Sequence, residues 1–158
     1  MLKIGDRMPH FEVMDQDGNV VRSAELLGRK TIIYFYPKDN TSGCTAEACN
    51  LRDNYERFLA KGYNVIGVSK DSVASHKKFA EKHGLPFTLL ADTATEMLQA
   101  FGVWGEKKMY GKTVMGTLRT TFIFDIIFGI HSSRIVGRLS NINLRSAFMI
   151  SIAADTNF

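Results

Sequence analysis

The two cysteines are the residues of this sequence with the clearest capacity for chemistry. Cys44 and Cys49 are its only cysteines in 158 residues, and they lie five positions apart. A thiolate is a nucleophile and a redox centre, and it forms most readily beside positive charge or unpaired N–H groups. Thr41, three residues before Cys44, can present a hydroxyl to the same space. The alternative is an inert, buried cysteine, since free cysteines are mostly of that kind.

The residues around Cys44 predict the local structure that a reactive thiolate needs. Residues 31–36 are apolar and rich in β-branched and aromatic types, which is typical of a buried strand. Residues 37–43 carry the proline, asparagine, serine and glycine that end it. Apolar residues then recur at three- and four-residue steps, which predicts a helix over 44–60. Cys44 therefore lies at a helix N-terminus, where the unpaired N–H groups and the helix dipole favour a thiolate.

The five-residue spacing restricts what the two cysteines can do together. In an intact helix they are separated by about 140° around the axis and about 7.5 Å along it. Their Cα atoms are then roughly 8–9 Å apart, beyond the roughly 7 Å that a disulfide tolerates. Either the two cysteines never bond, or the first turns of the helix unwind when they do.

The length and composition indicate one soluble globular domain spanning residues 1–158. Hydrophobic residues make up 45% and charged residues 23%, as in ordinary globular proteins. The N-terminus shows no apolar segment behind a basic start, and no run of 18 or more apolar residues occurs, so neither a signal peptide nor a membrane helix is expected. Two closely spaced cysteines without a disulfide framework fit a reducing cytoplasm, where such pairs are more often catalytic than structural.

The basic net charge does not by itself indicate a nucleic-acid partner. The formal charge is +4 and the pI is about 9.1. Basic and acidic residues alternate through most of the chain, as where Lys77 and Lys78 precede Glu81. We therefore expect a mixed, solvated surface and no nucleic-acid binding.

Strands and helices alternate along the chain, which predicts an α/β fold with parallel pairing. The expected elements are a hairpin of 11–14 and 20–22, a short helical turn at 23–28, strands at 31–36, 63–69, 87–90 and 120–124, and helices at 44–60, 72–83 and 95–101. The polar segment 105–116 has no predicted element. The reactive loop then lies beyond the carboxyl end of a strand, where open α/β sheets place their sites.

Other chemical motifs are weak. A phosphate-binding loop at 111–113 needs a glycine at position 106, which is Glu106. The four histidines show no metal-ligand spacing, and His76 and His83 are expected to be exposed on a helix. A cysteine protease would need a histidine base that the sequence does not identify.

The residues around Cys44 also carry a family resemblance. Pro37-x-x-x-Thr41-x-x-Cys44 resembles the peroxidatic motif of peroxiredoxins. The segment from Gly43 to Cys49, followed by Arg52-Asp53, resembles the bacterioferritin comigratory protein (PrxQ) subfamily. The supporting motifs are Gly5-x-x-x-Pro9-x-Phe11, Gly67-Val-Ser-x-Asp71, Leu90-x-Asp92, Gly102-Val-Trp-Gly-Glu106, Tyr110-Gly-Lys and Arg119-x-Thr-Phe. Together these motifs span residues 1–125.

The resemblance implies a thioredoxin-like fold, with a central mixed sheet flanked by helices, and thiol-dependent reduction of hydrogen peroxide and organic hydroperoxides. Cys44 is then the peroxidatic cysteine, which the peroxide oxidises to a sulfenic acid. Thr41 would hydrogen-bond the peroxide and the thiolate, Arg119 would stabilise the negative charge, and Pro37 would shield the sulfenic acid. Cys49 would be the resolving cysteine, and thioredoxin or a similar dithiol reductant would reduce the resulting Cys44–Cys49 disulfide. The resemblance implies no metal or organic cofactor, and we expect a monomer.

The composition changes after Asp125. Residues 126–158 contain no lysine, no glutamate and one aspartate, Asp155. Members of the family continue here with a charged turn, a strand and a charged amphipathic helix. The pattern in this chain is that of a frameshifted or replaced C-terminus, with a strand expected at 130–136 and a helix at 142–153.

Two further functions stay open at this point. One is a non-enzymatic, thioredoxin-fold binding or chaperone-like protein whose altered C-terminus has impaired the site. The other is a general disulfide oxidoreductase, against which the absence of Cys-x-x-Cys argues.

Overall fold

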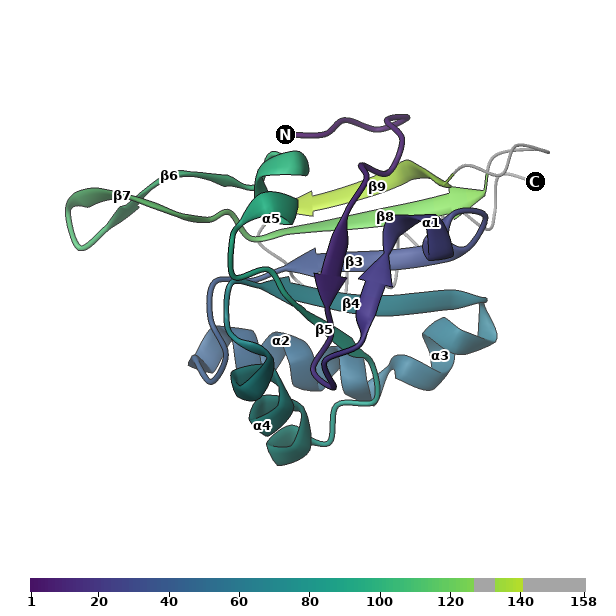
Figure 1. Cartoon of the computed structure of the whole chain (residues 1–158), viewed down its shortest axis with the longest axis horizontal. Helices are drawn as coiled ribbons and strands as arrows, with labels where there is room; N and C mark the ends of the chain where they lie inside the picture. Colours follow the sequence, from purple (N-terminus) through teal and green to yellow (C-terminus); the bar gives the residue numbers. More distant parts are fainter. Residues whose placement is uncertain (127–132, 141–158) are drawn as a thin grey trace.

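The computed structural model describes residues 1–126 and 133–140, which build a five-stranded sheet with helices on its faces and two separate hairpins (Figure 1). The strands are β1 (Glu12–Met14), β2 (Val20–Arg22), β3 (Lys30–Phe35), β4 (Tyr63–Ser69), β5 (Thr88–Ala91), β6 (Trp104–Met109), β7 (Lys112–Thr117), β8 (Thr120–Ile126) and β9 (Ser133–Ser140). The helices are α1 (Ser23–Leu26), α2 (Ser42–Asp53), α3 (Tyr55–Ala60), α4 (Val73–His83) and α5 (Glu96–Ala100). The predicted N-terminal hairpin and the four predicted central strands are confirmed.

The sheet is mixed, with the order β5-β4-β3-β8-β9. The central strand β3 runs parallel to β4, where Ile33 faces Ile66, and antiparallel to β8, where Ile33 faces Phe122. β4 and β5 are parallel, whereas β8 and β9 are antiparallel. The predicted α/β class with a mixed sheet is therefore confirmed.

Both faces of β3 are buried, and side-chain alternation divides its residues between two cores. Ile33 and Phe35 belong to a core that includes Phe101 and Phe122. Ile32, Tyr34 and Tyr36 belong to the opposite core, which the helices α2, α3 and α4 cover (Figure 1). Cys44 lies in this second core, so the fold itself buries the candidate nucleophile.

The single helix predicted over 44–60 is wrong in two respects. α2 begins at Ser42, and it ends at Asp53, one residue before a break at Asn54 that separates it from α3. The Asn54 side chain donates to the carbonyl of Asn50 at 2.9 Å. An asparagine that hydrogen-bonds to the local backbone competes with helix continuation, which accounts for the break. Both cysteines nonetheless lie in one helix, α2.

The polar segment 105–116, for which no element was expected, forms most of the antiparallel hairpin β6–β7. Tyr110 and Gly111 have φ values of 51° and 76°, as the two central residues of a tight hairpin turn require. The hairpin projects from the body of the molecule (Figure 1) and exposes most of its residues on both faces, so its sequence lacks the usual alternation. The 111–113 motif therefore spans the hairpin turn and the start of β7, and a strand, not a helix that could bind a phosphate, follows its glycine.

Beyond Asp125 a strand occurs at 133–140 in place of the predicted 130–136, and it pairs with β8. The helix predicted at 142–153 lies outside the described residues. Within the described part of the chain, no helix combines the length and apolar character needed to cross a membrane.

Candidate active site

Cys44 lies in the first turn of α2, directly after the loop that leaves the carboxyl end of β3. Thr41 is the N-cap residue, and its carbonyl accepts the N–H of Thr45 at 2.9 Å. Cys44 is 1% exposed and packs in the core that contains Tyr34 and Leu51. The predicted strand–loop–helix around the cysteine is confirmed.

Arg119 contacts the Cys44 thiol from a remote part of the sequence. Its Nη2 donates to Cys44 Sγ at 3.0 Å. The sheet explains the approach, because Thr120 at the start of β8 pairs with Phe35 at the end of β3. A Cβ atom on Gly43 would lie 3.2 Å from Arg119 Nη2, so the absence of a side chain there leaves room for the guanidinium. A fixed positive charge at this distance stabilises a thiolate.

Glu47 is a site residue that the sequence analysis missed. Its Oε2 accepts from Arg119 Nη1 at 3.1 Å, so one guanidinium holds both the thiol and a carboxylate. Glu47 follows Cys44 by three positions in α2 and therefore shares its helix face, which was the available sequence signal. Burial raises the pKa of Glu47 to about 7, against the opposing effect of the Arg119 charge.

We expect Glu47→Gln to stabilise the protein increasingly as the pH rises. The folded state holds the Glu47 proton more tightly than the unfolded state, so wild-type stability falls as the pH rises from 4.5 towards 7. Because the pKa of Glu47 is raised from 4.5 to about 7, ionising this carboxyl group lowers the free energy of unfolding by on the order of 3 kcal/mol above pH 7. Below the pKa of the unfolded state the group is protonated in both states, and the loss is absent. Urea unfolding at pH 4 and pH 8 measures this difference. The exposed glutamate variant Glu56→Gln is the control, and a gain from Glu47→Gln that does not grow with pH would contradict the linkage.

Pro37 and Thr41 lie in the loop between β3 and α2, and both are partly buried. The Thr41 hydroxyl makes no cap hydrogen bond to α2, and it donates instead to the carbonyl of Lys38 at 3.2 Å. Because that bond uses the hydroxyl proton, the oxygen lone pairs are left to accept a donor in the site. The loop thus places both predicted residues just before the helix turn that carries Cys44.

Cys49 lies in the middle of α2, partly buried, and both cysteines are free thiols. α2 is continuous from Ser42 to Asp53. The separation calculated for an intact helix therefore applies, and a Cys44–Cys49 disulfide requires α2 to unwind.

These features define an α/β oxidoreductase with a thiol at a helix N-terminus, and comparison with known proteins identifies its family. The chain belongs to the AhpC/TSA family, whose model matches residues 4–127. It is 45% identical over 124 residues to peroxiredoxin Bcp of Bacillus subtilis, which covers 78% of this chain and 79% of the relative. Peroxiredoxin Bcp of Escherichia coli K12 is also 45% identical over 124 residues, covering 78% of this chain and 80% of the relative.

Solved structures agree. Peroxiredoxin Q of Xanthomonas campestris superimposes with a TM-score of 0.81 at 32% identity, covering 93% of this chain and 90% of the other. The predicted thioredoxin-like fold and the predicted peroxiredoxin family are confirmed, and the chain is a thiol-dependent peroxidase. The family match ends two residues after Asp125, where the composition changes.

Proposed function

We propose that Cys44 is the peroxidatic cysteine and that hydrogen peroxide and organic hydroperoxides are its substrates. The observation that carries the proposal is the 3.0 Å contact between Arg119 Nη2 and Cys44 Sγ at the start of α2. The Cys44 thiolate attacks the terminal peroxide oxygen, an S–O bond forms and the O–O bond breaks. The sulfur loses two electrons and keeps the attacked oxygen as a sulfenic acid, while the other peroxide oxygen leaves as hydroxide or alkoxide and takes up a proton.

The neighbouring side chains take separate roles in this step. Arg119 stabilises the thiolate and the negative charge that develops on the leaving oxygen, as fixed donors do in acyl-transfer enzymes. The Thr41 hydroxyl orients the peroxide beside the sulfur. Pro37 shields the sulfenic acid from water.

Cys49 is the proposed resolving cysteine. Its thiolate attacks the Cys44 sulfenic sulfur, the oxygen leaves as water after protonation, and a disulfide forms. Thioredoxin or a similar dithiol then reduces that disulfide by thiol–disulfide exchange. The proposed setting is a reducing cytoplasm, which suits the two free thiols, and the proposed active form is a monomer.

Steady-state peroxide consumption with and without thioredoxin tests this cycle. We expect turnover in the wild type to depend on thioredoxin. Cys49→Ser should retain the first oxidation of Cys44 but lose thioredoxin-supported turnover by at least about tenfold, because no intramolecular disulfide forms. Wild-type turnover in Cys49→Ser with thioredoxin would remove Cys49 from the cycle.

The disulfide should also change the helix that carries it. We expect amide hydrogen exchange across residues 43–52 to be faster in the oxidised protein, since α2 cannot stay intact around a Cys44–Cys49 bond. The increase should be largest in the first turns, because Arg52 Nη1 donates to the His83 carbonyl at 2.6 Å and ties the end of α2 to α4. α4 is the internal control. Equal protection of α2 in reduced and oxidised protein would refute the unwinding.

A further inference from the structure

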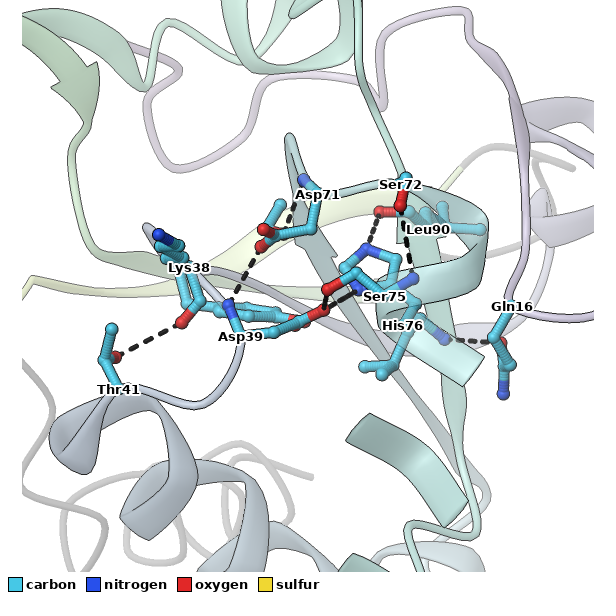
Figure 2. Close-up of polar contacts among 12 residues, drawn as sticks. Gln16, Lys38, Asp39, Thr41, Asp71, Ser72, Ser75, His76 and Leu90 are labelled. Atoms are coloured by element: carbon cyan, nitrogen blue, oxygen red, sulfur yellow. Dashed lines mark hydrogen bonds and ion pairs between the residues drawn. The ribbon is translucent and has the colours of Figure 1, made fainter. Parts of the chain in front are cut away.

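A buried pair, Asp39 and His76, lies behind the loop that leads to Cys44. Asp39 is in that loop and His76 is in α4. Their closest atoms, Asp39 Oδ2 and His76 Nδ1, are 2.8 Å apart, and the side chains are 2% and 0% exposed (Figure 2). The prediction that His76 is exposed is therefore wrong. Neither residue was assigned a role from the sequence.

Both ring nitrogens of His76 face oxygen acceptors. Nε2 lies 3.0 Å from the carbonyl of Leu90, which only accepts, so Nε2 carries a proton. Nδ1 faces the Asp39 carboxyl group, which also accepts from Tyr36 Oη at 2.6 Å and Ser75 Oγ at 2.8 Å. Burial alone would raise the pKa of Asp39, but the hydrogen bonds from His76, Tyr36 and Ser75 lower it. The Asp39 carboxyl group and the Leu90 carbonyl therefore hold the His76 ring from its two nitrogen-bearing sides.

A second anchor holds the backbone of the same loop residue. The Asp39 N–H donates to Asp71 Oδ2 at 2.9 Å, and Asp71 Oδ2 also accepts from Ser69 Oγ at 2.6 Å. Asp71 lies in the connection between β4 and α4, whereas His76 lies in α4 itself (Figure 2). Asp39 is therefore held through its backbone by the connection and through its side chain by the helix. The next residue, Asn40, has a φ of 60°, a left-handed conformation that asparagine adopts more readily than most other non-glycine residues.

The loop segment that these contacts hold also carries Thr41. Asp39 and Asn40 separate Lys38, whose carbonyl accepts the Thr41 hydroxyl, from Thr41 itself (Figure 2). α2 begins at the next residue, Ser42. Fixing Asp39 therefore fixes the orientation of the Thr41 hydroxyl and the start of the helix that presents Cys44.

We propose that Asp39, His76 and Asp71 are positioning residues that hold the Thr41 hydroxyl and the first turn of α2 in the geometry needed for attack on peroxide. The inference rests on the proposed peroxidatic role of Cys44. None of the three touches the reacting atoms, so their effect is confined to alignment. Misplacement by about 1 Å is enough to cost about 10²-fold in rate.

The test compares two rates on reduced protein in a Cys49→Ser background, where Cys44 is the one remaining thiol. Oxidation by hydrogen peroxide requires alignment by Thr41, whereas alkylation by iodoacetamide requires only an accessible thiolate. We expect Asp39→Ala and Asp71→Ala to lower the peroxide rate by about 10- to 100-fold and the alkylation rate by less than about threefold. His83→Gln, a substitution of the other histidine on α4, is the control and should change neither rate.

A conservative variant separates positioning from charge. In Asp39→Asn the amide oxygen still accepts from Tyr36, and the amide N–H donates to Nδ1 of a neutral His76 that keeps its Nε2 proton for Leu90. Asp39→Asn should therefore recover most of the peroxide rate that Asp39→Ala loses. If Asp39→Ala does not fold, the peroxide and alkylation rates are compared in Asp71→Ala and Ser75→Ala instead. Asp71 lies outside the buried core.

Three results would count against these proposals, and they are distinguishable. Parental peroxide rates in Asp39→Ala and Asp71→Ala would overturn the positioning role. An equal fall in the peroxide and alkylation rates would also overturn it, since it would show a general loss of structure. A parent protein that reacts with peroxide no faster than free cysteine would instead overturn the peroxidatic role of Cys44.

Discussion

Replacing Cys44 with serine should abolish peroxide reduction, lowering kcat/KM by about 10⁴-fold or more, as removal of an enzyme nucleophile does. The physical reason is twofold. A serine hydroxyl beside Arg119 stays protonated at neutral pH, so it is a poor nucleophile. Its oxygen also cannot be oxidised by peroxide in the way that a thiolate sulfur is oxidised to a sulfenic acid. Serine keeps nearly the shape of cysteine, so the buried site should stay folded. Consumption of hydrogen peroxide with thioredoxin and its reductase measures the loss.

The matched control is Cys49→Ser in a single-turnover experiment. Cys49 is partly buried in the same helix, and within the described part of the chain Arg119 donates to Cys44 and not to Cys49. That variant should consume one equivalent of peroxide at the wild-type rate, while Cys44→Ser should consume none. The reverse pattern would exchange the roles of the two cysteines, and appreciable turnover in Cys44→Ser would remove Cys44 from the chemistry.

The local parts of this site could be predicted because they depend on neighbouring residues. The run 31–36 is apolar because β3 is buried on both faces, and the break after it leads directly into α2. The contact between Cys44 and Arg119 is different, because it joins residues 75 positions apart. It exists because β8 pairs with β3 in one register, and no periodicity in the sequence specifies that register. Only the resemblance to a known family suggested Arg119.

The errors have similar causes. His76, Phe79 and Ala80 form the buried face of α4, and the spacing of three and four residues was visible in the sequence. A histidine was nonetheless expected outside, because its burial depends on Asp39, a partner from a distant loop. The β6–β7 hairpin was missed for the opposite reason: both its faces are largely exposed, so no burial imposes an alternating pattern.

Arg119→Met should lower the rate of Cys44 oxidation by about 10²- to 10³-fold, the usual cost of losing one fixed donor to developing negative charge. Methionine fills part of the same space without charge or donors. Arg119→Lys should recover only part of the rate, because a single ammonium lacks the planar fork by which Nη1 and Nη2 reach Glu47 and Cys44 at once. Stopped-flow oxidation of reduced protein measures all three rates.

Because one guanidinium contacts both Cys44 and Glu47, the oxidation rate and the stability of the protein should respond differently to substitutions of Arg119 and Glu47. Arg119→Met leaves the buried Glu47 carboxyl without its partner, so part of the damage above pH 7 is to stability. Adding Glu47→Gln should restore the melting temperature towards that of the wild type and leave the oxidation rate low, because the thiolate still lacks its cation. In Arg119→Met the alkylation rate and the oxidation rate of Cys44 should both fall, because the thiolate has lost its cation. In Asp71→Ala only the oxidation rate should fall, because that change disturbs alignment and leaves the charge in place. Recovery of the oxidation rate in the double variant would show that Arg119 acts by neutralising Glu47 and not by stabilising the thiolate.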